Sequence, residues 1–251
     1  MTHHQHTNEN FGKNLLWATL LNVVITVFQI VGGIISGSLA LISDAIHNLG
    51  DALAVFIAFI ANKVSQKEAT TSKTFGYKRI EILAALLNAL VLVVICVVLV
   101  YESIERIQQP KEIRADIMLF VAIIGFLANL VAVFILHKDS GKNINVKAAY
   151  LHLLGDTFSS VAVIVVGIVI YYKNIVWLDP AVTILISLYL LKHTYSIIKE
   201  TVNILMQGTP ANIDIMAIKN YLESFNEIAN IHHVHLWNLN DREIHFECHI
   251  E

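Results

Sequence analysis

Residues 39–61 read LALISDAIHNLGDALAVFIAFIA, an apolar run that carries the pentapeptide HNLGD at 47–51. A second copy of the pattern, HLLGD at 152–156, lies in another apolar run. Histidine and aspartate four residues apart lie on one face of a helix. Ionisable groups inside a bilayer are costly, so by default they mark a functional site. The two pentapeptides therefore predict one metal site with four ligands on two membrane helices: His47, Asp51, His152 and Asp156.

The composition predicts a membrane protein that crosses the bilayer several times. Of the 251 residues 56% are hydrophobic and only 15% are charged, more apolar surface than a soluble domain can bury. The net charge of −3 argues against a nucleic-acid partner, which would require a basic face. The two cysteines, Cys96 and Cys248, provide neither a disulfide framework nor a paired thiolate site.

Six segments have the length of about 20 apolar residues that a bilayer core requires. They cover about 14–36, 39–61, 80–103, 115–137, 146–172 and 175–198. We expect an all-α membrane protein with six transmembrane helices, followed by a small α+β cytosolic domain. The predicted organisation is a flexible cytosolic N-terminus (1–13), a transmembrane transport domain (14–204) and a cytosolic C-terminal domain (205–251).

The basic residues of the loops predict the orientation. The 62–79 and 138–147 loops together carry eight lysines and arginines, whereas the other loops between the predicted spans carry four. Because cytoplasmic loops are enriched in Lys and Arg, both termini are expected in the cytoplasm.

The segment after residue 205 has the pattern of a soluble module. Apolar residues recur at helical spacing over 212–225, and two alternating runs at 231–239 and 243–250 flank Asn240-Asp241. This pattern predicts a helix and a β-hairpin. Two strands bury little apolar surface, so we expect either a dimer or a missing C-terminal portion.

The two pentapeptides are predicted to lie at the same depth in the bilayer. At about 1.5 Å per residue, Asp51 lies roughly 18 Å from the outer end of its span and Asp156 roughly 15 Å from the inner end of its span. Both are near the midplane, where secondary carriers hold their substrate. Two imidazoles and two carboxylates suit zinc, with cadmium, cobalt or iron as alternatives. Since histidine titrates near neutrality, metal release can be exchanged for proton uptake.

Further polar residues lie on the same helical faces or inside other spans. Asp44 precedes the first pentapeptide by one helical turn and is assigned either a supporting role or a place in a wetted vestibule. Ser159 and Ser160 extend the stripe of the second pentapeptide. Gln29 and Asn129 are expected to hydrogen-bond between helices.

Three longer stretches resemble the cation diffusion facilitator family of zinc-efflux carriers. They are 38–47 (SLALISDAIH), 75–81 (FGYKRIE) and 101–106 (YESIER). The resemblance runs through nearly the whole chain. It implies a six-helix homodimer that exports zinc against protons by alternating access. The 138–147 loop lacks a histidine-rich tract, which favours a bacterial-type member in the inner membrane.

The resemblance also implies roles for individual residues. The two pentapeptides match the transmembrane metal ligands of the family, and a histidine at position 47 resembles its zinc-selective members. In the C-terminal module, His232 and His249 match positions that bind metal in some members. Strand alternation places His233 and His235 on one face and His232 on the other. Part of the family's ferredoxin-like cytosolic fold is absent from the sequence, so this domain is expected to be partial.

Other classes of function fit the residues less well. An intramembrane metal-dependent hydrolase would need an open coordination position and a separate general base, and the chain has no His-Glu-x-x-His motif. A metal sensor would need an output domain. We therefore expect a carrier rather than an enzyme, with divalent metal, protons and the lipid bilayer as its partners and zinc as cargo rather than cofactor.

Overall fold

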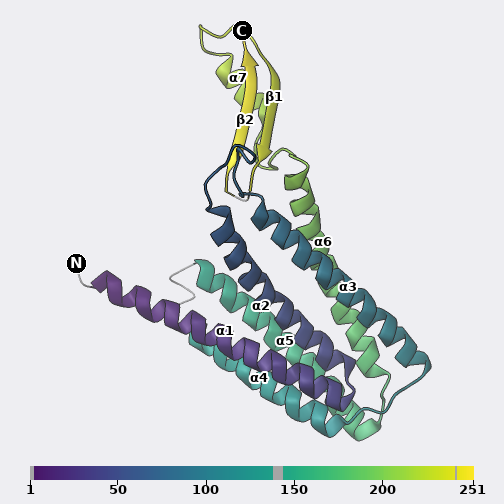
Figure 1. Ribbon diagram of the computed structural model, residues 1–251. Helices are drawn as coiled ribbons and strands as arrows, with labels where there is room; N and C mark the ends of the chain where they lie inside the picture. Colours follow the sequence, from purple (N-terminus) through teal and green to yellow (C-terminus); the bar gives the residue numbers. More distant parts are fainter. Residues whose placement is uncertain (1–2, 138–143, 241) are drawn as a thin grey trace. The chain divides into compact units, whose positions relative to one another are not determined.

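The computed structural model describes residues 3–137, 144–240 and 242–251, and the side chains of 3–19, 144–149 and 152 lie outside the described set. Within these ranges the chain is mostly helical and ends in a two-stranded antiparallel sheet (Figure 1). The elements in order are α1 (His3–Ser36), α2 (Leu39–Ser65), α3 (Ile80–Gln108), α4 (Ala115–His137), α5 (Ile144–Lys173), α6 (Leu178–Leu205), α7 (Ile215–Leu222), β1 (Ile231–Asn238) and β2 (Ile244–Ile250).

Five helices in the described ranges are long and apolar enough to cross a membrane. They are α2, α3, α4, α6 and the part of α5 from Leu153 to Lys173. In α1 the apolar stretch Leu20–Ser36 is shorter, although the helix itself begins at His3, earlier than predicted. The expected multi-pass membrane protein is confirmed at this level.

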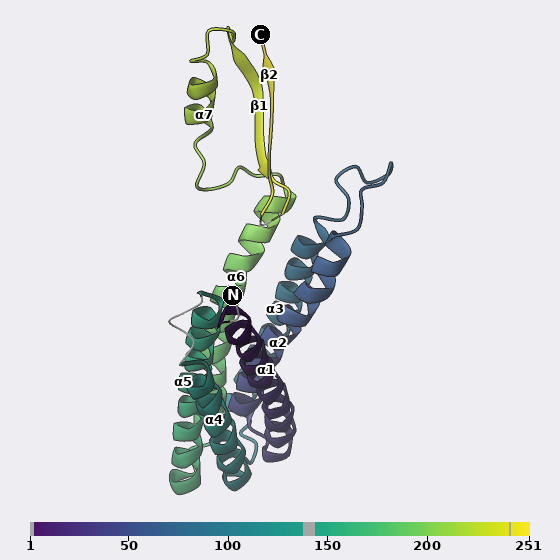
Figure 2. The same ribbon diagram turned by 90° about the vertical axis from the view of Figure 1, so that its left-hand side faces the viewer.

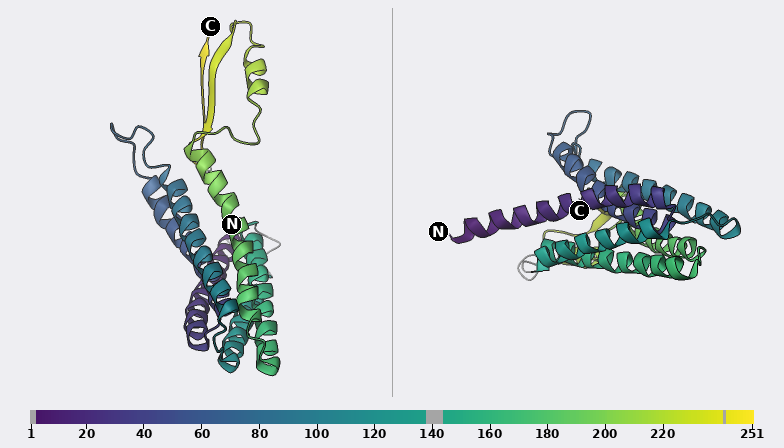
Figure 3. Two further views of the ribbon diagram at one scale, coloured as in Figure 1. Left: turned by 90° about the vertical axis from the view of Figure 1, so that its right-hand side faces the viewer. Right: turned by 90° about the horizontal axis from the view of Figure 1, so that it is seen from below.

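The chain forms two compact units, and α2, α3 and α6 each contribute to both. The first unit comprises Met1–Leu53 and Leu92–Lys192, and the second comprises Ala54–Val91 and His193–Glu251. In the first unit α4 lies beside both α1 and α5 (Figures 1 and 3). Its core contains side chains from α2, α4 and α5, among them Leu41, Met118 and Val163. Both pentapeptides belong to this unit.

The turn between α1 and α2 is held by Asp179, a residue of α6. Its Oδ1 accepts hydrogen bonds from Ser38 Oγ (2.5 Å) and Ala40 N (3.2 Å), and its Oδ2 accepts one from Leu39 N (2.7 Å). The first N–H groups of a helix have no partner within the helix and carry partial positive charge. The buried Asp179 carboxylate therefore satisfies the start of α2. Gly37, at φ +74°, allows the tight turn that brings α2 to this position.

The second unit contains the predicted hairpin. Strands β1 and β2 pair in antiparallel fashion, and α7 lies beside β1 (Figure 2). The helix is shorter than the predicted 212–225 because the Asp214 side chain caps its start, accepting from Met216 N at 2.8 Å, and turns follow Glu223. Asp241, in the predicted turn, lies outside the described residues.

The segment between α2 and α3 also contacts this hairpin. Lys78 Nζ forms an ion pair with Glu243 at 2.5 Å. The centre of the His245 ring lies 5.2 Å from that of Phe75, which it meets edge to face, and 5.6 Å from that of Trp237, on which it stacks.

Candidate metal centre

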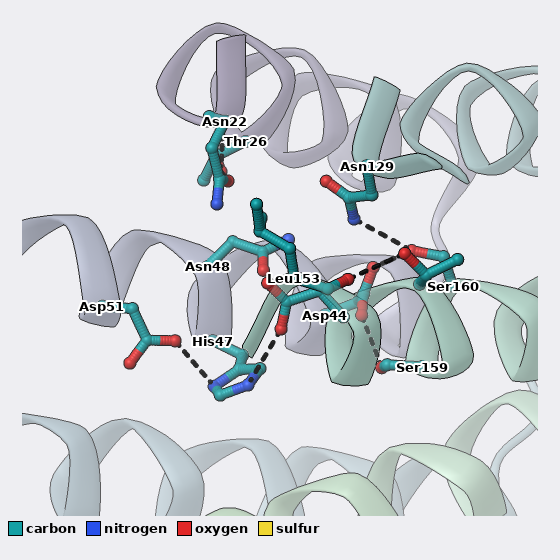
Figure 4. Close-up of polar contacts among 12 residues, drawn as sticks. Asn22, Thr26, Asp44, His47, Asn48, Asp51, Asn129, Leu153, Ser159 and Ser160 are labelled. Atoms are coloured by element: carbon teal, nitrogen blue, oxygen red, sulfur yellow. Dashed lines mark hydrogen bonds and ion pairs between the residues drawn. The ribbon is translucent and has the colours of Figure 1, made fainter. Parts of the chain in front are cut away.

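His47 on α2 lies between two carboxylates. Its Nδ1 is 3.4 Å from Oδ2 of Asp51, one turn further along the same helix. Its Nε2 is 3.6 Å from Oδ1 of Asp156 on α5. Figure 4 shows the Asp51 and His47 side chains pointing toward one another beside the helix that carries Leu153. Three of the four predicted ligands thus lie together, contributed by both pentapeptides.

The fourth predicted ligand, His152, belongs to α5, but its side chain lies outside the described residues. The three predicted ligands whose side chains are described differ in exposure. The side chain of Asp156 is 2% exposed, that of His47 20% and that of Asp51 36%. The group therefore extends from the interior of the first unit toward an accessible face.

The separations suit a tetrahedral ion. Zinc bonds to histidine nitrogen and carboxylate oxygen are about 2.1 Å long, which gives a tetrahedral edge of about 3.4 Å between ligand atoms. The 3.6 Å between His47 Nε2 and Asp156 Oδ1 is close to that edge. One zinc ion can therefore bridge α2 and α5 with only a small adjustment of these two side chains.

Asp44 supports the site from the buried side of α2. Its carboxylate accepts hydrogen bonds from Ser159 Oγ at 2.5 Å, Gln29 Nε2 at 3.1 Å and Ser160 Oγ at 3.4 Å. The residue is 1% exposed, so the alternative of a wetted vestibule is wrong. Three donors from α1 and α5 satisfy a buried carboxylate that would otherwise be strongly unfavourable. These bonds hold α5 against α2 next to the ligands.

Neighbouring amides extend this network. Gln29 and Asn129 form hydrogen bonds between helices, as predicted from the sequence. Asn48 Nδ2 donates to Gln29 Oε1 at 3.5 Å, and Asn129 Nδ2 donates to Ser160 Oγ at 3.5 Å. Figure 4 shows Asn129 directed toward Ser160. Helices α1, α2, α4 and α5 are thus connected around the site.

The glycines of the two pentapeptides have different surroundings, which leads to a prediction. A Cβ atom added at Gly50 would lie 2.6 Å from Leu92 Cδ2, whereas one added at Gly155 would meet nothing within 4 Å among the described atoms. We expect Gly50→Ala to be less favourable than Gly155→Ala by about 1 kcal/mol, because only at position 50 must a neighbour, Leu92, repack. Gly155→Ala should be neutral or stabilising, since alanine favours helix. Thermal unfolding of the purified variants tests this, and equal shifts in Tm would contradict it.

A second group of histidines lies on the hairpin. One ring nitrogen from each of His232, His233 and His249 lies within 4.8 Å of the others. His232 pairs with His249 and His235 with Glu247, so two residues of β1 oppose one of β2. His233 in this bulge has φ +50°. A bulge changes the direction of side chains, so the alternation predicted for His233 is wrong and this residue joins the other two.

Two of these features were not predicted from the sequence: the bulge at His233 and the cap that Asp179 provides for α2. The bulge that redirects His233 leaves no signal in the sequence. Asp179 does have a signal in the sequence, because it is an acidic residue directly before Pro180 at the start of an apolar run.

Comparison with known proteins identifies the family. Residues 15–206 match the cation efflux transmembrane domain. The chain is 42% identical over 241 residues to the zinc transporter ZitB of Pectobacterium atrosepticum, covering 95% of this chain and 75% of the relative. It is 37% identical over 248 residues to the zinc transporter ZitB of Escherichia coli (strain K12), covering 96% and 79%.

A third relative is named for several metals. The chain is 36% identical over 249 residues to the cadmium, cobalt and zinc/H(+)-K(+) antiporter of Bacillus subtilis (strain 168), covering 98% of this chain and 80% of the relative. The chain therefore belongs to the cation efflux family, the cation diffusion facilitators.

Proposed function

We propose that this protein is a secondary transporter that works by alternating access. It exports a divalent metal ion, mainly zinc, from the cytoplasm in exchange for protons. One observation carries the proposal: His47 Nε2 on α2 lies 3.6 Å from Asp156 Oδ1 on α5, so that a nitrogen and a carboxylate ligand from the two helices converge, with Asp51 beside the other ring nitrogen. We propose His47, Asp51, His152 and Asp156 as the transport site. A site formed by two helices can change its access when one helix moves against the other.

The exchange of metal for protons follows from the chemistry of these ligands. Ionised carboxylates only accept hydrogen bonds, whereas an imidazolium has an N–H on each nitrogen. With a carboxylate 3.4 Å from one nitrogen and another 3.6 Å from the other, an imidazolium at His47 suits the metal-free site. Zinc requires a nitrogen without its proton, so loading the metal releases a proton.

The choice of metal rests on the ligand set and on the relatives. Mixed nitrogen and oxygen ligands suit zinc, and also cadmium, cobalt and ferrous iron. The relatives named above carry zinc in their names, and one also carries cadmium and cobalt. We propose zinc as the main cargo.

We propose six transmembrane helices in a lipid bilayer, with α1 as a further span beside the five that are long and apolar enough to cross it. The proposed domains are 1–13, 14–204 and 205–251, the last a small α+β cytosolic domain. Both termini would be cytoplasmic, in a bacterial inner membrane, since the 62–79 and 138–147 loops hold most of the basic loop residues. The small two-stranded sheet supports a homodimer, because it buries little surface alone.

We also propose that the hairpin binds metal through His232 and His249, joined by His233. Three imidazoles within reach of one ion leave a fourth position for water or another ligand.

Transport into inverted membrane vesicles tests the main proposal. With the vesicle lumen acidified, radioactive zinc should accumulate inside while a pH dye reports protons leaving. Vesicles without the protein are the control, and an ionophore that collapses the proton gradient should abolish accumulation. Accumulation that persists without a gradient and without proton movement would refute antiport. The hydrolase alternative has no support, because the chain belongs to a transporter family.

A further inference from the structure

A cavity of about 420 Å³ lies in the second unit at the start of α3. It is lined by residues 72–80 together with Leu83, Gln207 and Leu239. The transport mechanism uses none of these residues.

The charged residues that line the cavity are all basic: Lys73, Lys78 and Arg79. Lys78 is paired with Glu243 at 2.5 Å, and Lys73 Nζ lies 4.9 Å from the centre of the Tyr77 ring. Arg79 Nε is buried and has no hydrogen-bond partner in the described part of the chain. A buried guanidinium nitrogen without an acceptor is unfavourable, so an anion bound in this cavity would be stabilised by Arg79.

The remaining lining is apolar where it meets the membrane helix. Phe75 is 53% exposed and Leu83 48% exposed, and Ile80 begins α3, which is apolar enough to cross a bilayer. A basic cavity that continues into exposed apolar surface at the end of a membrane helix has the two parts of a phospholipid site. The basic part suits a headgroup, and the apolar part suits the adjoining acyl chains.

We propose that this cavity binds the phosphate of an anionic phospholipid, with Arg79 and Lys73 as its cationic ligands. A guanidinium can donate two parallel hydrogen bonds to phosphate oxygens. The acyl chains then lie along Leu83 and the exposed face of α3. The apolar walls favour a lipid over free phosphate, which would gain nothing from Phe75 or Leu83.

Lipid binding by the purified full chain tests the proposal. Native mass spectrometry compares phosphatidylglycerol with phosphatidylcholine for the wild type, Arg79→Gln, Lys73→Gln and the matched control Lys67→Gln. Lys67 belongs to the same segment between α2 and α3 but does not line this cavity. We expect the wild type to prefer phosphatidylglycerol. Arg79→Gln and Lys73→Gln should each weaken that binding about fivefold, the effect of one basic side chain near an anionic membrane. Lys67→Gln should bind like the wild type.

Three results would overturn the proposal: equal binding of the two lipids, equal losses in all three variants, or complete displacement of the lipid by millimolar inorganic phosphate. The last result would assign the cavity to the free anion. Arg79→Lys keeps the charge but cannot form the paired hydrogen bonds, so it should also bind more weakly than the wild type. If Arg79→Gln does not fold, Lys73→Gln against Lys67→Gln decides the question.

Discussion

Asp156→Ala is expected to abolish zinc transport while leaving membrane insertion intact. The carboxylate is 2% exposed and lies 3.6 Å from His47 Nε2, where it supplies the α5 side of the proposed site. Its removal leaves zinc short of one ligand in a medium of low dielectric, where no bulk water replaces it. We expect zinc flux to fall by more than about a hundredfold, which exceeds the loss typical when a residue that only hydrogen-bonds to a metal ligand is replaced. Asp51→Ala should have the same effect from the α2 side.

Two further variants make this result specific to the ligand. Asp156→Asn keeps the volume of the side chain, so loss of flux in this variant cannot be due to a cavity. Glu105→Ala removes an exposed carboxylate from α3 and should transport like the wild type. Flux is measured in inverted vesicles, with the amount of inserted protein determined by immunoblot. Wild-type flux in Asp156→Ala or Asp51→Ala would remove that residue from the site.

His47→Asp is expected to change which metal is carried. The substitution replaces a nitrogen ligand between two carboxylates with a third carboxylate. Oxygen ligands favour harder ions such as manganese, whereas imidazole favours zinc. We expect the ratio of zinc to manganese transport to fall at least about tenfold, which corresponds to about 1.4 kcal/mol in relative binding.

The control for selectivity is His47→Gln, which is neutral and polar but lacks the imidazole nitrogen. It should lose transport of both metals instead of exchanging one for the other. Competition between zinc and manganese in the same vesicles gives the ratio directly. A ratio in His47→Asp equal to that of the wild type would show that selectivity is determined elsewhere in the protein.

Much of the architecture could be predicted from the sequence because it depends on local periodicity. The predicted spans at 39–61, 80–103 and 115–137 lie within α2, α3 and α4, and the hairpin strands agree to within about a residue. The spacing of four residues in HNLGD was enough to place His47 beside Asp51. Helical geometry determines such contacts without reference to the rest of the chain.

The tertiary structure decided the contacts between residues distant in the sequence. Only folding showed that Asp44 is a buried acceptor for Gln29, Ser159 and Ser160, and that Asp179 caps α2 from α6. A carboxylate in an apolar run must find donors, but its sequence does not state which helix provides them. The bulge at His233 likewise depends on the pairing of two strands. Periodicity thus determined the helices and the spacing of their ligands, whereas packing determined which partners satisfy each buried charge, because burial makes an unsatisfied polar group costly wherever its donors lie in the chain.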